Sequence, residues 1–229
     1  MTIGVPMPAF ETIKKLTEKV TGWSRPKKSA LDKLVRPRKP HLFRFKDDGL
    51  IPNHPTFPLI VYRGVVGFSE AFDPAAVFEE LFQKNGWGDS WRDGIYDYVH
   101  YHSRIHEVLG IARGSGKVQL GGKRGRTLTL KAGDVAILPA GTGHQCLSAS
   151  KDFLVVGAYP PTGKYDECTD VEDHKRAGPW RGSPNECSTL KLRKARLARA
   201  PMASPTECLA LKQAASSDSI IGCMNMVPT

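Results

Sequence analysis

The chain has 229 residues, of which 40% are hydrophobic, 24% charged and 8% aromatic, a composition typical of a globular protein. It contains no run of about 18 apolar residues, which excludes a membrane-spanning helix. The formal net charge of +10 is uneven, because residues 1–46 hold 12 Lys/Arg and 3 Asp/Glu, residues 47–174 hold 12 and 17, and residues 175–229 hold 9 and 3.

The two basic ends differ from the middle of the chain in their residue patterns. Residues 8–20 have apolar side chains near helical spacing, which predicts an amphipathic helix on the domain surface. Residues 24–40 are rich in proline and basic side chains and predict a connector with a short helical turn around 31–35. We therefore assign residues 1–40 to a basic, partly helical N-terminal extension and residues 171–229 to a basic C-terminal tail of low order.

The middle of the chain, residues 41–170, has the pattern of one β-domain. Short runs of β-branched and aromatic residues recur roughly every 8–12 residues, separated by Gly, Pro and Asp, which is typical of a sandwich or barrel. Asp73 and Pro74 predict the N-cap and first residue of one inserted helix that ends at Asn85. The predicted strands are 41–45, 59–63, 96–102, 108–112, 118–120, 127–130, 135–138, 145–147 and 153–159.

Two short segments of this domain concentrate histidines. In a strand, residues two apart share a face, so His100 and His102 project together. A turn at 103–105 then places Glu107 on the next strand. Two imidazoles and a carboxylate that converge in this way are suitable ligands for a divalent transition metal. His144 follows a turn-rich segment and is placed to close the set from another strand.

Structural roles are the alternative for each of these residues. A histidine pair can simply pack on a half-buried strand, but an inward carboxylate beside it is costly unless it is paired or binds a metal. Tyr96 and Tyr98 share strand parity with the first histidine, and packing is favoured over contact with a substrate. His106 is turned away from the metal as an outer partner or a surface histidine. Cys146 and Ser148 share parity with the last histidine and are candidates for the same cavity.

Both segments resemble the conserved motifs of the cupin superfamily. The first motif, Gly-x5-His-x-His-x3-4-Glu-x6-Gly, is matched at every position over residues 94–114. The second, Gly-x5-Pro-x-Gly-x2-His-x3-Asn, is matched over residues 133–148 except that Ser stands at the Asn position. Residues 41–168 further resemble the YjlB-like group of bacterial cupins through the stretches HYHS, HEVLG, PAGTGH and VVGAYP.

The resemblance implies an all-β fold, a single jelly-roll barrel with one inserted helix and the N-terminal helical extension. It assigns metal-ligand roles to His100, His102, Glu107 and His144. The expected cofactor is one divalent transition metal ion, with iron, manganese, nickel and zinc all compatible, and a net charge near +1 once Glu107 is counted. Related jelly-roll proteins often dimerise, and a homodimer is compatible with the sequence.

A metal-dependent enzyme acting on a small, anionic substrate is the leading functional interpretation, with non-haem dioxygenase chemistry as the favoured reaction class. The residues that would carry a reaction are not assigned. The alternative is a non-catalytic sensor or storage module that binds a metal or ligand and carries basic tails.

The cysteines and the N-terminus bear on the compartment and the partners. Five cysteines, none in a C-x-x-C pair, together with an N-terminus that lacks a secretory pattern, predict reduced thiols in the cytoplasm. We expect no membrane partner. Nucleic acid is not expected either, because residues 1–46 are too short and too broken by proline for a helix-turn-helix.

Overall fold

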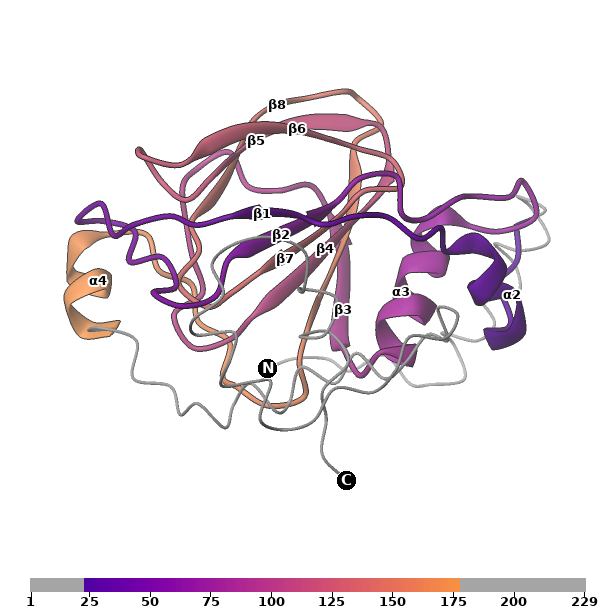
Figure 1. Ribbon diagram of the computed structural model, residues 1–229, viewed down its shortest axis with the longest axis horizontal. Helices are drawn as coiled ribbons and strands as arrows, with labels where there is room; N and C mark the ends of the chain where they lie inside the picture. Colours follow the sequence, from indigo (N-terminus) through magenta and orange to yellow (C-terminus); the bar gives the residue numbers. More distant parts are fainter. Residues whose placement is uncertain (1–22, 178–229) are drawn as a thin grey trace, which may run out of the picture.

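The computed structural model describes residues 23–177, and this part of the chain forms an all-β jelly roll of two facing sheets (Figure 1). The six-stranded sheet has the order β1-β2-β7-β4-β9-β3, and the three-stranded sheet has the order β6-β5-β8. Every pairing within them is antiparallel. The strands are β1 (His41–Phe43), β2 (Leu59–Tyr62), β3 (Gly88–Asp93), β4 (Glu107–Arg113), β5 (Ser115–Leu120), β6 (Arg126–Lys131), β7 (Val135–Leu138), β8 (His144–Ala149) and β9 (Leu154–Tyr159).

The predicted all-β fold is confirmed, and eight of the nine predicted strands correspond to strands of the structure. The strand predicted at 96–102 is wrong. That segment forms only two isolated bridges, His100 with His144 and Tyr101 with Cys168. Since successive residues pair with different parts of the chain, no continuous ladder develops, although the composition is that of a strand.

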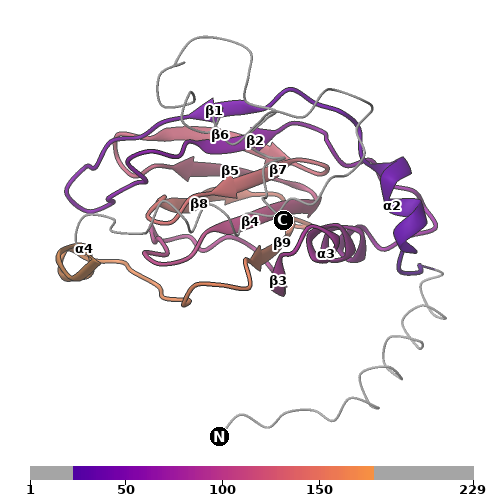
Figure 2. The same ribbon diagram turned by 60° about the horizontal axis from the view of Figure 1, so that its bottom comes forward.

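Within residues 23–177, three helices accompany the sheets: α2 (Lys28–Leu34), α3 (Pro74–Lys84) and α4 (Val171–Ala177). Helices α2 and α3 lie together at one side of the sheets and α4 lies at the opposite side (Figures 1 and 2). The predicted cap of α3 is confirmed, because the Asp73 side chain accepts a hydrogen bond from Ala75 N at 3.1 Å. The helix predicted at 8–20 and the tail beyond 177 lie outside the described residues. None of these helices is long and apolar enough to cross a membrane.

Strand β4 is buried on both faces and separates two apolar cores. Leu109 and Ile111 point between the sheets, whereas Val108 and Ala112 face outward. The outward face packs against α3, where a Cβ at Gly110 would lie 2.3 Å from the Phe78 ring. Glycine at this position therefore lets the helix approach the sheet closely.

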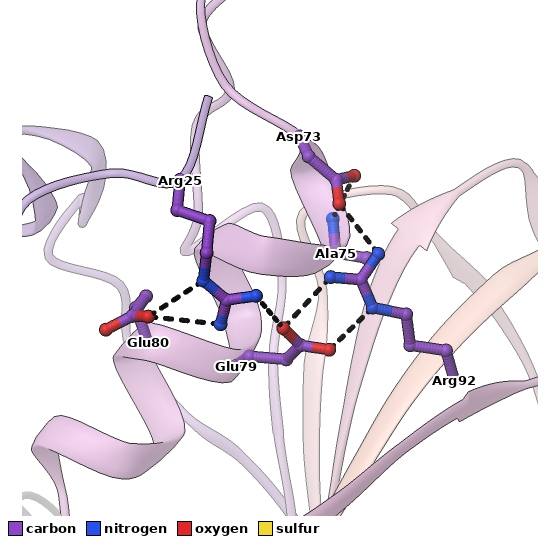
Figure 3. Close-up of polar contacts among 6 residues, drawn as sticks. All are labelled: Arg25, Asp73, Ala75, Glu79, Glu80 and Arg92. Carbon is purple, nitrogen blue, oxygen red and sulfur yellow. Dashed lines mark hydrogen bonds and ion pairs between the residues drawn. The ribbon is translucent and has the colours of Figure 1, made fainter. Parts of the chain in front are cut away.

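Helix α3 is also held by a charged network at its exposed side (Figure 3). The Arg92 guanidinium from β3 binds Glu79 through Nε at 2.5 Å and Nη2 at 2.9 Å, and Asp73 through Nη1 at 2.7 Å. Arg25 binds Glu79 at 2.8 Å and Glu80 at 3.0 Å. All three nitrogens of the Arg92 guanidinium thus donate to carboxylates.

Candidate metal centre

Three separate parts of the fold meet at one end of the space between the sheets. His100 and His102 lie in the segment between β3 and β4, Glu107 is the first residue of β4, and His144 is the first residue of β8. The backbones of His100 and His144 exchange two hydrogen bonds, at 3.2 and 2.9 Å. The two histidine-containing segments are therefore joined directly through the main chain.

The turn before His144 is built around glycine. Gly141 has a φ of 85°, a left-handed conformation that glycine adopts without strain. In this conformation its N–H donates to the carbonyl oxygen of His102 at 2.7 Å. The turn thus ties the second histidine segment to the first a second time.

Each of the three imidazoles has its Nδ1 against a backbone carbonyl oxygen. His100 contacts the carbonyl of Tyr98 at 3.3 Å, His102 that of Asp166 at 2.5 Å, and His144 that of Thr142 at 3.2 Å. A carbonyl oxygen can only accept, so each Nδ1 must carry the proton. In the neutral rings every Nε2 is therefore left with a free lone pair, the state in which histidine binds a metal.

The ligand atoms of the three histidines all lie within 4.8 Å of one another, and all three residues are buried. Glu107 adds a fourth donor, because its Oε2 lies 3.3 Å from His144 Nε2 and 3.5 Å from His102 Nε2. Two ligands about 2.1 Å from one ion are separated by about 3.0–3.4 Å in octahedral or tetrahedral geometry. The two separations from Glu107 are close to this range.

The carboxylate oxygen of Glu107 indicates which kind of ligand the donors would hold. Glu107 is 2% exposed, and its Oε2 is buried with no hydrogen-bond partner among the described residues. Lone pairs of two imidazoles face this oxygen, so the donors are arranged for a cation and not for one another. The residues present therefore fit a divalent metal ion.

The charge states of the site follow from burial and from the Glu107 carboxylate. Burial, followed by the adjacent His144, lowers the pKa of His100 to about 4, so this ring is neutral at pH 7. Burial acts to raise the pKa of Glu107, but His102 and His144, when they carry a proton on Nε2 and donate to the carboxylate, outweigh burial and lower the pKa. For His102, burial acts to lower the pKa, and contact with Glu107 outweighs it and raises the pKa. A proton on His102 is thus the competitor of a metal ion.

A cavity of about 290 Å³ opens directly beside these donors. Its walls combine aromatic and aliphatic side chains with the polar donors at one end, as is usual for small-molecule sites. The lining residues are Trp91, Arg92, Asp93, Gly94, Ile95, Tyr96, His100, His102, Glu107, Leu109, His144, Tyr159 and Tyr165.

The remaining predicted site residues have different positions. Tyr96 lines the cavity, and Tyr98 stacks on it from outside, with ring centroids 4.9 Å apart. His106 is turned away from the metal donors, and its Nδ1 accepts from Ala140 N at 2.9 Å. Cys146 and Ser148 do not line the cavity, since β8 has an irregularity in its pairing with β5 at this point and Ser148 is exposed.

Tyr159 and Tyr165 also line the cavity, although neither was predicted as a site residue. The Tyr159 hydroxyl accepts from Trp91 Nε1 at 3.2 Å and contacts the Glu107 carboxylate. Strand parity with the buried Val155 could have identified Tyr159, because both point between the sheets. Tyr165 lies in a loop, where no periodic pattern marks the inward side chains.

Comparison with known proteins agrees with the motif resemblance. Residues 93–156, which include all four candidate ligands, match the cupin domain family. The chain is 40% identical over 149 residues to the uncharacterized protein YjlB of Bacillus subtilis strain 168, covering 65% of this chain and 79% of that protein.

Solved structures show more distant similarity. A TDP-quinovose 3,4-ketoisomerase from Campylobacter jejuni is 15% identical, with a TM-score of 0.32 over 38% of this chain and 73% of that one. Acireductone dioxygenase from Bacillus anthracis is 19% identical, with a TM-score of 0.30 over 38% of this chain and 61% of that one. Similarities at this level carry no argument about activity.

Proposed function

The chain belongs to the YjlB-like cupins, and on this basis we propose that it binds one divalent metal ion through His100, His102, Glu107 and His144 and acts on a small molecule in the adjoining cavity. One observation carries the proposal. All three imidazoles donate from Nδ1 to backbone carbonyls, which leaves three Nε2 lone pairs free, and those of His102 and His144 face a buried carboxylate oxygen.

A bound ion would supply Lewis acidity and, in the case of iron, redox chemistry of the dioxygenase type, the reaction class we favour. The four ligands carry a single negative charge, so the site with a divalent ion has a net charge near +1. That charge favours a small molecule that presents an anionic or enolic oxygen. Iron, manganese, nickel and zinc are all compatible with three imidazoles and one carboxylate.

The protein's own groups have separate tasks in this proposal. The anionic Glu107 balances the ion, and the Tyr159 hydroxyl, held by Trp91, contacts that carboxylate from the cavity side. Leu109 and Ile95 line the cavity with apolar side chains, which lower the local dielectric constant around the donors. The substrate is thus expected to meet the metal from the cavity.

Elemental analysis of protein purified without a metal-affinity tag tests the proposal. We expect about one equivalent of a transition metal in the wild type. His144→Ala should lower metal affinity by more than the 10- to 100-fold that loss of an outer hydrogen-bond partner costs, because it removes a donor outright. The matched control is His41→Ala, which removes an exposed histidine on β1 and should leave metal content unchanged.

Stoichiometric metal retained in His144→Ala would contradict the ligand assignment. Oxygen uptake by the iron-loaded wild type, screened against small acids and enols, separates the two functional interpretations. Metal uptake without turnover of any compound would favour the sensor or storage module over the enzyme.

A further inference from the structure

The cavity beside the candidate metal centre has walls of a distinct chemical kind. Two exposed tyrosines, Tyr96 and Tyr165, line it, and Tyr98 stacks on Tyr96 from outside; we call these three residues the tyrosine rim. They are 48%, 41% and 50% exposed, and within the described part of the chain they account for three of the five large hydrophobic side chains that are exposed. Their concentration at one cavity indicates a surface for a ligand and not scattered surface residues.

The rim is held in place before any ligand arrives. The Glu167 carboxylate accepts from the Tyr98 hydroxyl at 2.8 Å and from the Tyr165 hydroxyl at 3.1 Å, so it bridges two distant segments of the chain. Tyr98 in turn stacks on Tyr96 with an interplanar angle of 13°. The rings are thereby fixed at low entropic cost to a ligand that packs against them.

The rim lies directly against the metal donors. The Tyr96 ring centroid is 5.2 Å from that of His100, and the Tyr165 centroid is 5.0 Å from that of His102. Because the hydroxyls of Tyr98 and Tyr165 are engaged by Glu167, these rings offer aromatic surface and not free hydrogen-bond donors. This favours a planar apolar ligand over a polyhydroxylated one.

The charged residues that line the cavity restrict the charge that the ligand can carry. Arg92 is the one lysine or arginine among the described lining residues, and its three guanidinium nitrogens are bound by Glu79 and Asp73 (Figure 3). The other charged lining residues, Asp93 and Glu107, are acidic. A phosphate or second carboxylate on the ligand would therefore meet no unpaired cation in this wall.

From these observations we infer that the ligand is a small aromatic molecule with a single oxygen-bearing head group, its head at the metal donors, its ring against Tyr96 and Tyr165, and no further anionic group. The inference rests on the proposed function and names the ligand class of the same site. A volume of about 290 Å³ accommodates a single substituted ring or a molecule of similar size.

Three hydroxamic acids test the inference on full-length protein loaded with Ni²⁺. Acetohydroxamic and benzohydroxamic acids share one chelating head and differ in methyl against phenyl, and 4-carboxybenzohydroxamic acid adds an anion to the ring. By isothermal titration calorimetry, benzohydroxamic acid should bind about tenfold more tightly than acetohydroxamic acid. The added carboxylate should weaken binding at least about threefold.

Variants of Tyr165, half-exposed in its loop, identify the surface responsible. Tyr165→Leu should weaken benzohydroxamic acid about three- to tenfold and change acetohydroxamic acid by less than about twofold. Tyr165→Phe keeps the ring, loses only the hydroxyl that binds Glu167, and should retain most of the affinity. Equal affinities for the methyl and phenyl compounds, equal losses for both in Tyr165→Leu, or tighter binding of the carboxylated compound would each overturn the inference.

The same experiment distinguishes failure of the inferred ligand class from failure of the proposed metal-binding function. Elemental analysis before the titration reports whether Ni²⁺ is held. Protein that takes up no metal overturns the proposed function together with the ligand class. Protein that holds one equivalent and fails the hydroxamate comparison overturns the ligand class alone.

Discussion

Five buried or half-buried histidines have Nδ1 bound by a backbone group, and the kind of group separates two roles. In His100, His102 and His144 the partner is a carbonyl, so Nδ1 donates and Nε2 is free to bind a cation. In His54 and His106 the partners are N–H groups, so Nδ1 accepts and the proton lies on Nε2. The latter two therefore hold loops, and the backbone distinguishes ligands from structural histidines.

The structural histidine His54 makes the stability of the protein depend on pH. Burial, followed by the nearby His106, lowers the pKa of His54 to about 4. The unfolded chain has a histidine pKa near 6.5, so between about pH 6.5 and 4 the unfolded state binds a proton that the folded state does not. The stabilisation from the neutral ring is present above pH 6.5 and is lost as the pH falls toward 4.

His54→Asn should remove this dependence. An Asn oxygen can accept the N–H groups of Thr56 and Phe57, which now bind His54 Nδ1 at 3.1 and 2.8 Å, in an Asx turn. Between pH 7 and pH 5 the wild type should lose about 2 kcal/mol more of its unfolding free energy than the variant, measured by urea denaturation. His106 is present in both proteins, so the effect of its own burial cancels in the comparison, and the difference contains the His54 ring and its repulsion with His106.

His41→Asn is the matched control for this measurement, because His41 is exposed on β1. It should keep the pH dependence of the wild type. Identical pH dependence in His54→Asn and the wild type would show that the ring does not titrate with a lowered pKa.

Among the elements, β3 and β9 show how closely the strands and their side chains are packed. A Cβ at Gly157 on β9 would lie 2.1 Å from the Trp91 ring, whereas a Cβ at Gly88 on β3 meets nothing within 4 Å. Gly157→Ala should therefore lower the unfolding free energy by about 1–3 kcal/mol, since overpacking forces Trp91 to move. Urea denaturation monitored by tryptophan fluorescence gives the loss of unfolding free energy. The fluorescence of the folded protein reports the movement of Trp91.

Gly88→Ala is the control on the paired strand, and it should cost less than about 0.5 kcal/mol. If both alanine variants were equally stable, the close approach of Trp91 to the β9 backbone would be refuted.

Helix α3 depends on Asp73 in two ways that substitution can separate. The side chain caps the helix by accepting from Ala75 N, and it also binds Arg92 at 2.7 Å (Figure 3). Asp73→Asn keeps an acceptor for the cap and loses the ion pair, whereas Asp73→Ala loses both. The alanine variant should be less stable than the asparagine variant by about 1 kcal/mol in urea denaturation. Equal stabilities would mean that the cap contributes nothing.

The accuracy of the strand predictions follows from burial. Strands such as β4 and β7 are apolar and buried, so their composition identified them. The edge strand β3 (GDSWRD) is mostly exposed and polar, has no alternation, and was missed. Residues 96–102 have strand composition, but their backbone partners lie on β8 and in the loop at Cys168, which composition does not encode.

At the scale of the whole molecule, the candidate metal centre joins parts of the chain that are distant in sequence. His144 belongs to the three-stranded sheet and Glu107 to the six-stranded sheet. An ion held by both would bind the folded state only, because the unfolded chain does not bring these donors together. Metal binding should therefore stabilise the entire barrel.

Removal of the metal should be measurable as a loss of thermal stability. At a free metal concentration of about 100 times the dissociation constant, binding stabilises by about 2.7 kcal/mol, so chelation with EDTA should lower the Tm by about 5–10 °C. Differential scanning calorimetry with and without EDTA checks this. His144→Ala should show no such shift, and an unchanged Tm in the chelated wild type would argue against a metal that bridges the sheets.

The amino-acid sequence alone determined which side chains could form the site. Motif spacing selected His100, His102, Glu107 and His144, and the Asp73–Pro74 pair placed the inserted helix. Both signals are local: the motifs depend on residue spacing and turn residues, and the helix on capping, over a few positions that the order of residues states directly.

Only the tertiary structure decided how those side chains are used. The carbonyl that orients His102 belongs to Asp166, 64 residues away, and Glu167 joins Tyr98 to Tyr165 across a similar separation. Such pairings arise when the closing of the two sheets brings a loop over the cavity, and no periodicity in the chain records them. The proton positions on the imidazoles and the aromatic wall beside them are consequently properties of the folded molecule.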